Sequence, residues 1–585
     1  MKHNILMYTC LCILLAGFSG CSDFLDQVPD DRQTIDEVFQ KKSPSEEYLA
    51  NVYNYIRDES NQWSDNPWTG NVDEMNVAWA KHAIYRINIG NWNAADAPFG
   101  FWGNYYQGIR SATYFINHID GNDEILRLNG QGLIDQYKAE ARFLRAYFYF
   151  MLIRQYGPVV IIGNNELAVD APVSELLLPR NPFDECVDYV VHQLDSAAVV
   201  LPVVPAQDRD YGRATKGAAL AVKSRLLLYA ASPEYNGNTF FVDFKNEDGT
   251  QLISQTFDNE KWKRAADAAK EVIDLGVYHL YKDPSGSIVE TQRNILLEQW
   301  NEECIFVRKS NDLSNWDIHC SIRRAGGWNG IGATQEMVDA YFMRDGKSIN
   351  QSALYSEDGF TNGIYNMYLN REPRFYASIL YNGRKYKGGS ITQDSVTIDF
   401  TYSGSDGKQN GGEDYTHTGY LVSKNVSTET NRITGQNNSR PLVLFRLGEI
   451  YLNYAEALAE YGGSTNEEEA LTYLNLIRER AGIPQYGNGS NALPAVSGDE
   501  LIKKIRMERR VELAFETHRW FDIRRWNIVK SVMGDIHGMN IDKNDNEFYQ
   551  RVVAANNTWK DAYYWWPIPQ YEMDRSSLVV QNPGW

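Results

Sequence analysis

Tryptophan is the residue type whose number and spacing say most about this chain's chemistry. There are 15 Trp and 37 Tyr in a chain with a mean hydropathy of −0.47, more rings than we expect a core alone to need. One group of tryptophans, Trp316 and Trp328, flanks Arg323 and Arg324. A ring on a loop is not part of the buried face of a helix. It can therefore stack on a ligand, while nearby polar groups orient that ligand. Five Trp fall within residues 61–102, a stretch rich in Gly and Asn: Trp63, Trp68, Trp79, Trp92 and Trp102.

Two tryptophans are predicted to belong to the core instead. Trp102 opens a run with apolar residues at helical spacing, and Trp300 precedes the strand-like run 305–307. Both settings offer an apolar face on which a ring can be buried. Among the remaining rings, Trp79, Trp92 and Trp328 are the candidates for stacking on a ligand.

A cysteine at residue 21 closes a short apolar segment at the start of the chain. Apolar residues dominate 5–16, and small residues stand directly before Cys21. This segment is too short to remain in a bilayer, which predicts a secretory signal over 1–20. The cysteine resembles that of a bacterial lipobox, with Phe18 where Leu is usual, so we expect its thiol to carry a diacylglycerol. A plain secretory signal, with the cysteine there by chance, is the alternative.

The charge balance excludes some partners. Removing residues 1–20 takes away one Lys and no acidic residue, which leaves 565 residues and changes the net charge from −19 to −20. An acidic surface argues against nucleic acid and against electrostatic docking on anionic lipid. No later apolar run approaches the length of a membrane span, so we expect the lipid on Cys21 to be the only anchor.

Catalytic and metal-binding patterns are missing from the sequence. With 76 acidic residues, some pair will always stand at a glycosidase separation, so carboxylates alone predict nothing. There is no Gly-x-Ser-x-Gly, no His-Glu-x-x-His, no phosphate loop and no zinc spacing. The run Asp542-x-Asn544-x-Asn546 fails as an EF-hand, because Glu547 and Val553 replace its glycine and final acid. We read that run as a solvated turn, with bound calcium as the alternative, and expect no cofactor and no enzyme activity.

The cysteines form no disulfide framework. Beyond the signal and the lipid site there are three, Cys186, Cys304 and Cys320, so at least one is unpaired. A bridge between Cys304 and Cys320 remains open.

Helices must position these residues. Apolar spacing predicts a helix over 133–156 that stops at Gly157-Pro158. Further helices are predicted over 181–200, 213–231 and 259–276, the last with a glycine just past its end.

Helices return at residue 447. Gly462-Gly463 ends the first, Thr465-x-x-Glu468 predicts a capping box for the second, and Ser497-x-x-Glu500 predicts a third cap. Two helices in about 34 residues, with small residues where they cross, are typical of a tetratricopeptide unit. We expect the pairs 133–200, 213–276 and 447–481 to stack into one frame.

Between these helices, residues 281–440 read as loops and short strands. Gly, Ser, Asn, Thr and Asp crowd the second half, around alternating pieces such as 396–400. The predicted fold is mostly α: a tetratricopeptide-like helical-repeat scaffold with an irregular insert that carries the ligand site.

Several long segments resemble the SusD/RagB family of surface nutrient-binding lipoproteins. They occur in the family's order and span the chain that follows the signal. They are 21–26 (CSDFLD), 139–147 (AEARFLRAY), 445–457 (FRLGEIYLNYAEA), 508–516 (ERRVELAFE), 519–526 (RWFDIRRW), 566–569 (WPIP) and 581–585 (QNPGW).

Most charged residues in these segments are predicted to support the scaffold. Arg142, Arg145 and Arg510 lie on helices whose other faces are apolar. Spacings of three and four predict pairs within one helix, Arg509 with Glu512 and Glu516 with Arg519.

The resemblance implies a carbohydrate ligand that is held without being cut. It also implies a site made by an early loop and a later one, where the two tryptophan groups fall. Asp73 resembles the family's early-loop acidic position. Together, the candidates for contacting the glycan are Asp73, Trp79, Trp92, Trp316, Arg323 and Trp328.

The resemblance further implies a location on the outer membrane and a partner, a SusC-like TonB-dependent barrel on which the lipoprotein sits as a hinged lid. A peptide-binding member of the family, or a glycoside hydrolase, are the alternatives. The expected organisation is a signal over 1–20, an acylated tether over 21–40, and SusD-like regions over 41–280 and 281–585 that pack as one unit.

Overall fold

Helices include about 44% of the residues in the computed structural model of the protein. The structure describes residues 35–61, 63, 65–166, 171–172, 175, 177–309 and 313–585. Cys21, the predicted signal and most of the predicted tether lie outside the described residues. Within the described ranges, no helix combines the length and apolar character that crossing a bilayer requires.

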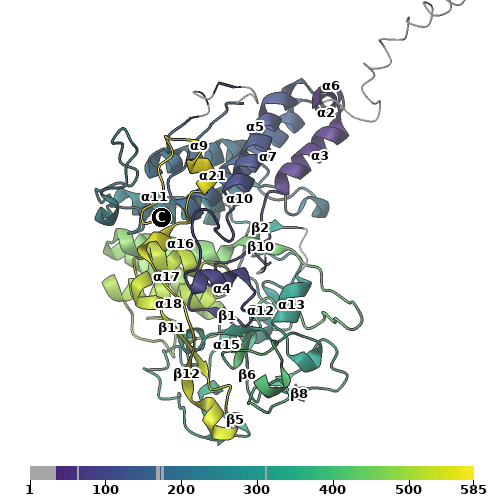
Figure 1. Ribbon diagram of the computed structural model, residues 1–585, viewed down its shortest axis with the longest axis vertical. Coiled ribbons are helices and arrows are strands. Elements are labelled where there is room, and N and C mark those ends of the chain that lie inside the picture. The colour runs from purple at the N-terminus through teal and green to yellow at the C-terminus, as the bar shows by residue number, and fades with distance from the viewer. Residues whose placement is uncertain are drawn as a thin grey trace, which may run out of the picture.

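The longer helices pack one against the next in chain order (Figure 1). The predicted pairs are present as α7 with α9, α10 with α11, and α16 with α17, and α11 packs directly on α16 although the insert separates them in sequence. The mostly α scaffold is confirmed. These helices are α5 (Trp102–His118), α7 (Gln131–Tyr156), α9 (Phe183–Val200), α10 (Lys216–Ala231), α11 (Glu260–Ile273), α16 (Leu447–Tyr461), α17 (Ser464–Arg480) and α18 (Gly498–Glu512).

Local signals explain some helix ends and not others. Gly157, at φ +73°, ends α7 as the Gly-Pro pair predicts, and the Thr215 hydroxyl caps α10. The capping box predicted at Thr465 is wrong, because two glycines at positive φ turn the chain into α17 one residue earlier, at Ser464. Ser497 does occupy the position before α18, but its side chain makes no capping hydrogen bond.

The insert is built from short elements, as its composition predicts. Its strands belong to antiparallel two-stranded sheets, and some of their partner strands come from the sequence before or after the insert. The pairs are β1 (Met75–Val77) with β3 (Ile331–Ala333), β2 (Cys304–Arg308) with β10 (Leu442–Arg446), β4 (Phe360–Thr361) with β5 (Ile364–Tyr365), β6 (Ile379–Tyr381) with β9 (Tyr420–Val422), and β7 (Lys385–Tyr386) with β8 (Val396–Thr397). A further sheet, outside the insert, pairs β11 (Asp535–Met539) with β12 (Arg551–Asn556).

Shorter helices surround the frame and the insert. The end of the predicted tether forms α2, and its Phe39 is buried in the core. These helices are α2 (Ile35–Gln40), α3 (Lys42–Tyr53), α4 (Ala83–Asn88), α6 (Asp123–Leu128), α12 (Ile288–Asn294), α13 (Ser314–His319), α14 (Gln335–Ala340), α15 (Pro373–Ser378), α19 (Arg519–Arg525), α20 (Val529–Val532) and α21 (Gln570–Met573).

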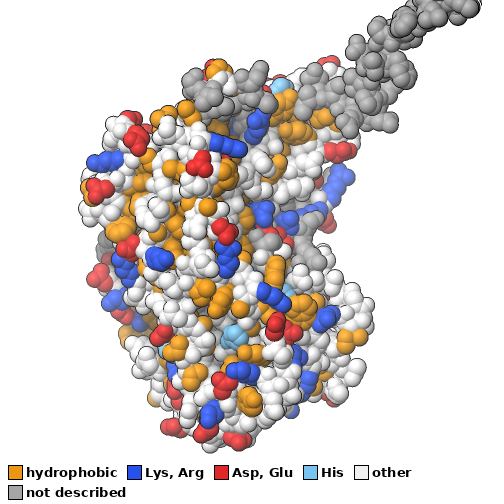
Figure 2. Space-filling model, viewed as in Figure 1, with side chains coloured by type: hydrophobic (Ala, Val, Ile, Leu, Met, Phe, Trp, Pro, Cys, Tyr) orange, Lys and Arg blue, Asp and Glu red, His pale blue; other side chains and the backbone are white. Residues whose placement is uncertain are grey.

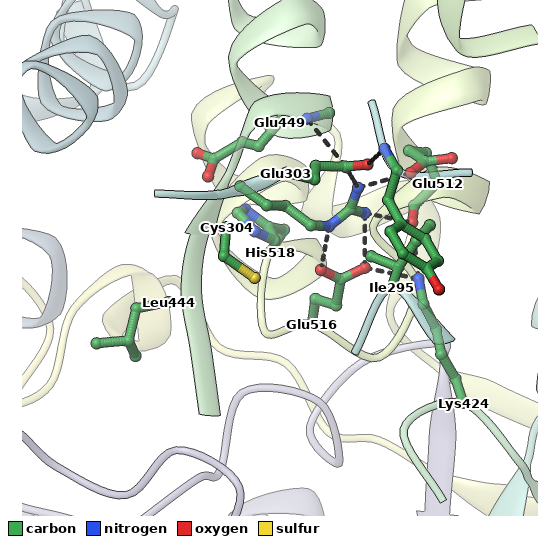
Figure 3. Close-up of polar contacts among 12 residues, drawn as sticks. Ile295, Glu303, Cys304, Lys424, Leu444, Glu449, Glu512, Glu516 and His518 are labelled. Carbon is green, nitrogen blue, oxygen red and sulfur yellow. Dashed lines mark hydrogen bonds and ion pairs between the residues drawn. The ribbon is translucent and has the colours of Figure 1, made fainter. Parts of the chain in front are cut away.

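A buried ion-pair network joins the frame to the insert (Figure 3). Arg446, at the end of β10, bonds Glu303 at 2.7 Å, Glu512 at 2.8 Å and Glu516 at 2.8 Å. Lys424 also bonds Glu516, at 2.6 Å. Such pairs fix geometry more than they add stability, which agrees with a scaffold role.

The pairs predicted within single helices are wrong. Arg509 bonds Asp522, Glu512 bonds arginines from outside its own helix, and Arg519 bonds Asp73. Their side chains are buried, so each meets a partner across a packing interface instead of along its helix surface.

Most tryptophans serve the core, contrary to the prediction that the rings exceed what a core needs. Trp63 is the most exposed, at 45%, and Trp300 is half-buried where the sequence predicts a core residue. The ten buried ones are Trp68, Trp79, Trp92, Trp102, Trp262, Trp316, Trp520, Trp526, Trp565 and Trp566.

The three cysteines of the described chain are free and buried. Cys304 and Cys320, whose bridge the sequence left open, therefore stand as separate thiols. Burial raises the pKa of Cys186 and of Cys304 to about 12, so both thiols stay protonated at neutral pH.

Candidate functional site

A two-stranded sheet brings the early and late tryptophan segments together. Strand β1 pairs with β3 so that Met75 faces Ala333 and Val77 faces Ile331. The pairing continues past the strands, where the Ala78 amide donates to the Gly330 carbonyl at 2.9 Å. The residues that follow β1 therefore lie beside the residues that precede β3.

Five rings meet at this junction, which we call the tryptophan cluster: Trp63, Trp79, His82, His319 and Trp328. The centre of the Trp79 ring lies 6.4 Å from that of Trp63, 4.9 Å from His319 and 6.1 Å from Trp328. Trp63 also meets His82 edge-on at 4.6 Å. Trp79 is 4% exposed and Trp328 is partly buried, whereas Trp63 is 45% exposed, so Trp63 is the ring of the cluster most open to solvent.

Two contacts fix the Trp79 ring. Its indole N–H donates to the Asp414 carboxylate at 2.9 Å. The ring also lies against Gly330, where a Cβ atom would stand 2.2 Å from a ring carbon. A glycine is therefore required at residue 330 for the ring to occupy its place.

His319 contributes a neutral ring to the cluster. Burial lowers the pKa of His319 to about 4, against the opposing effect of the Asp414 charge. At neutral pH the cluster therefore carries no imidazolium at this position.

Polar groups stand around the cluster. The Arg432 guanidinium lies 5.4 Å from the centre of the Trp328 ring, and Lys81 lies 3.5 Å from the exposed carboxylate of Glu413. With Asp414, these side chains supply donors and acceptors next to an apolar ring face. Flat rings with a few polar groups can orient a ligand that has both apolar faces and hydroxyls.

Asp73, a predicted contact residue, lies away from solvent. It is 3% exposed, and its carboxylate accepts hydrogen bonds from Arg519 at 2.8 Å and 2.9 Å and from Arg510 at 2.6 Å. Burial opposes ionisation, but the Arg510 and Arg519 guanidiniums outweigh it and hold the pKa of Asp73 at about 2. The structure gives this carboxylate arginine partners in place of a free face.

Trp92 is likewise not brought to the cluster. It is 6% exposed and packs among Tyr563, Trp566 and Trp585, with ring centres 4.8 Å, 5.0 Å and 4.4 Å away. This ring belongs to an aromatic core formed with the end of the chain.

Trp316 and Arg323 flank the late segment without joining the cluster. The indole N–H of Trp316 donates to the Lys424 carbonyl at 3.3 Å, and the ring lines a cavity of about 50 Å³ beside Lys424. Arg323 donates to the carbonyls of Ser405 and Asn410 and so braces that loop. Of the six predicted contact residues, the structure brings Trp79 and Trp328 together.

Trp63, the exposed ring of the cluster, is not among the stacking candidates that the sequence predicts. A signal for it exists: residues 61–66 read Asn-Gln-Trp-Ser-Asp-Asn, with no apolar neighbour for the ring. His82 and His319 carry no comparable signal, because only the β1–β3 pairing makes them neighbours of Trp63.

Known proteins resemble the chain along most of its length. A family model described as SusD family matches residues 302–585, and one described as starch-binding associating with outer membrane matches residues 23–228. A SusD-like protein of Bacteroides ovatus is 26% identical over 538 residues, which cover 90% of this chain and 83% of that protein.

Solved structures share the fold as well. The structure of BT4246 is 27% identical, has a TM-score of 0.81, and the match covers 93% of this chain and 99% of that one. A SusD-like protein from Bacteroides fragilis, also 27% identical, has a TM-score of 0.76, with 94% and 99% covered. The helical frame, the insert and the matches to both parts of the sequence agree, and the chain belongs to the SusD/RagB family.

Proposed function

We propose that the protein is a cell-surface glycan-binding protein that holds an oligosaccharide on the tryptophan cluster without cleaving it. The observation that carries this proposal is the half-exposed ring of Trp63, supported from below by Trp79, His82 and His319. The C–H face of a sugar ring packs on such a ring, and the sugar hydroxyls bond polar side chains at its edge.

Membership of the family supports the same class of ligand. The family model that matches residues 23–228 is described as starch-binding associating with outer membrane. The fold alone does not choose a ligand, so the assignment to a glycan rests on the cluster together with that description.

Binding and catalysis are tested together. The full-length protein, run through native gels that contain candidate polysaccharides, should be retarded by at least one of them. Trp63→Ala and Trp328→Ala should each weaken that affinity about three- to tenfold, the range for one aromatic contact. Phe257→Ala, which removes a 61% exposed ring outside the cluster, is the control and should leave retardation unchanged.

Gel retardation that is unchanged in both tryptophan variants would refute the assignment of the site. Incubation with the retarding polysaccharide should release no new reducing ends, and their appearance would make the protein an enzyme.

We also propose that Cys21 is acylated and that the protein acts as a lid on a TonB-dependent outer-membrane barrel, to which it delivers the glycan. A lipid on a tether would keep the lid close to the barrel while it opens. Labelling of cells with palmitate should mark the wild-type protein and not Cys21→Ala. Normal glycan uptake through this protein after deletion of the barrel would contradict the lid.

A further inference from the structure

A large concavity lies apart from the tryptophan cluster. It is a groove of about 820 Å³ between α3, the start of α7, the loop 202–215 and the end of β2. None of the five cluster residues lines it. In Figure 2, Lys and Arg side chains gather where the right-hand outline of the molecule is indented, below the position of α3 in Figure 1.

The charge of the groove is opposite to that of the chain. Its lining includes five basic residues and two acidic ones, although the whole chain has a net charge of −19. A concave surface with an excess of one sign of charge attracts ligands of the other sign. The basic residues are Lys42, Arg209, Arg213, Arg308 and Lys309, and the acidic ones are Glu46 and Asp210.

Arg213 is held in place at the groove. Its Nε and Nη2 donate to Glu140 at 3.3 Å and 2.8 Å, and its guanidinium lies 5.3 Å from the centre of the Tyr137 ring. Glu140 is fully buried, whereas the Arg213 side chain is 34% exposed. In the described part of the chain Nη1 of Arg213 has no hydrogen-bond partner, so one donor edge of an oriented cation is left for a ligand.

Two further cations stand beside it. Lys309 donates to the carbonyl of Arg209 at 2.7 Å, which leaves its charge without an acidic partner among the described residues. The exposed Arg209 guanidinium also pairs with no acid there. Gly212, at φ +90°, lets the loop approach the Lys309 side chain, where an added Cβ would stand 3.0 Å from the Lys309 Cβ.

The groove also has an aromatic surface. Tyr211 lines it and stacks in parallel on the half-buried Trp300, with ring centres 4.3 Å apart and an angle of 5° between the planes. A flat ring next to oriented cations suits a sugar unit that bears an anionic group better than it suits a simple anion.

We propose that this groove is a second ligand site, which takes oligosaccharide units that carry carboxylate or sulfate groups. The choice of a sugar rests on the proposed function, whereas the choice of an anion rests on the groove alone. The ligand of the tryptophan cluster needs no charge, so the two sites sort neutral and anionic sugars.

The test compares charged and neutral probes on the full-length protein by calorimetry. The anionic probes are oligogalacturonate and a chondroitin sulfate oligosaccharide, and the neutral probe is the polysaccharide that retards the protein in gels. We expect the anionic probes to bind, more weakly at about 0.15 M salt than at low salt, because salt screens the attraction. Arg209→Gln combined with Lys309→Gln should weaken anionic binding about tenfold and leave neutral binding unchanged.

The matched control is Lys263→Gln combined with Lys503→Gln, which removes the same charge from exposed sites and should leave every affinity unchanged. Trp63→Ala should weaken neutral binding only, so a failure of the tryptophan cluster and a failure of the groove give different patterns.

Three results would overturn the groove proposal. One is the absence of binding by either anionic probe, and another is equal anionic affinity in the groove variant and the control variant. The third is tighter binding of oligoglutamate than of either sugar, which would assign the groove to an acidic protein partner.

Discussion

Arg519 donates two hydrogen bonds to the carboxylate of Asp73, a residue 446 positions earlier in the chain. The contact ties the loop before β1 to α19 at the far end of the sequence. Since β1 also positions Trp79, the ion pair anchors the early half of the tryptophan cluster to the helical frame. Asp73 therefore supports the tryptophan cluster through the scaffold.

Replacing Asp73 with Asn should reduce the stability of the protein and leave glycan binding unchanged. Without the carboxylate, the buried Arg519 loses its charge partner, at a cost of about 3–5 kcal/mol in the free energy of unfolding. The pKa of about 2 lies below the usual 3.8, so the carboxylate stabilises the protein above about pH 4, and that contribution is lost as the pH falls towards 2. Urea unfolding at several pH values should show the difference from wild type narrowing below about pH 4.

Asp96→Asn is the control for that series, because Asp96 pairs with Arg86 on the surface and should change stability by less than about 1 kcal/mol. If Asp73→Asn keeps its stability and loses glycan retention, Asp73 touches the ligand, as its place in the sequence predicts.

Glu74 should make stability fall as the pH rises. Burial and the adjacent charge of Asp73 raise the pKa of Glu74 to about 8, from an ordinary value of 4.5. Between these values the folded protein holds a proton that the unfolded chain releases, so rising pH favours unfolding. Glu74→Gln imitates the protonated side chain and should raise the melting temperature near pH 8, with little change near pH 5.

Glu500→Gln is the matched control for Glu74, since Glu500 is half-exposed beside Lys504 and its pKa is lowered. A Glu74→Gln protein that melts below wild type near pH 8 would show that the buried side chain is ionised.

The frame could be predicted from the sequence, because its signals are local. Apolar residues at helical spacing and the glycines at 157 and 462 mark α7 and α16 without reference to anything distant. The same is true of the insert, whose turn-rich composition excludes long helices. The small residues on α10 are also visible in the sequence, and they let neighbouring helices approach closely.

The site could be predicted only in part, because burial depends on distant partners. Trp79 and Trp92 look alike in sequence, both in a loop-rich stretch. Trp92 is covered by Trp566 and Trp585, from the last twenty residues of the chain, whereas Trp79 is met by Trp328 through β3. No local pattern separates these two outcomes.

Glu512 should be among the most sensitive positions for stability. It bonds Arg374, Arg446 and Arg480, which come from α15, β10 and α17. These guanidiniums hold the pKa of Glu512 well below its usual range, against the effect of burial. Glu512→Gln should lower the free energy of unfolding by about 3–5 kcal/mol, measured in urea, since buried cations lose their counter-charge. Glu500→Gln again serves as the exposed control, and an equal effect of the two substitutions would contradict the network's role.

Gly330→Ala should weaken glycan binding although it removes no side chain that is proposed to contact the glycan. The added methyl would stand 2.2 Å from the Trp79 ring, so the ring must move and Trp63 and Trp328 lose their support. We expect at least a threefold loss of affinity in gels, comparable to removing one aromatic contact, together with a change in tryptophan fluorescence. Gly132→Ala is the control: it lies in the first turn of α7 with nothing within 4 Å of the new Cβ, and should leave both glycan affinity and tryptophan fluorescence unchanged. Full affinity in Gly330→Ala would mean that glycan binding does not depend on the position of Trp79. That result would contradict the assignment of the tryptophan cluster as the binding site.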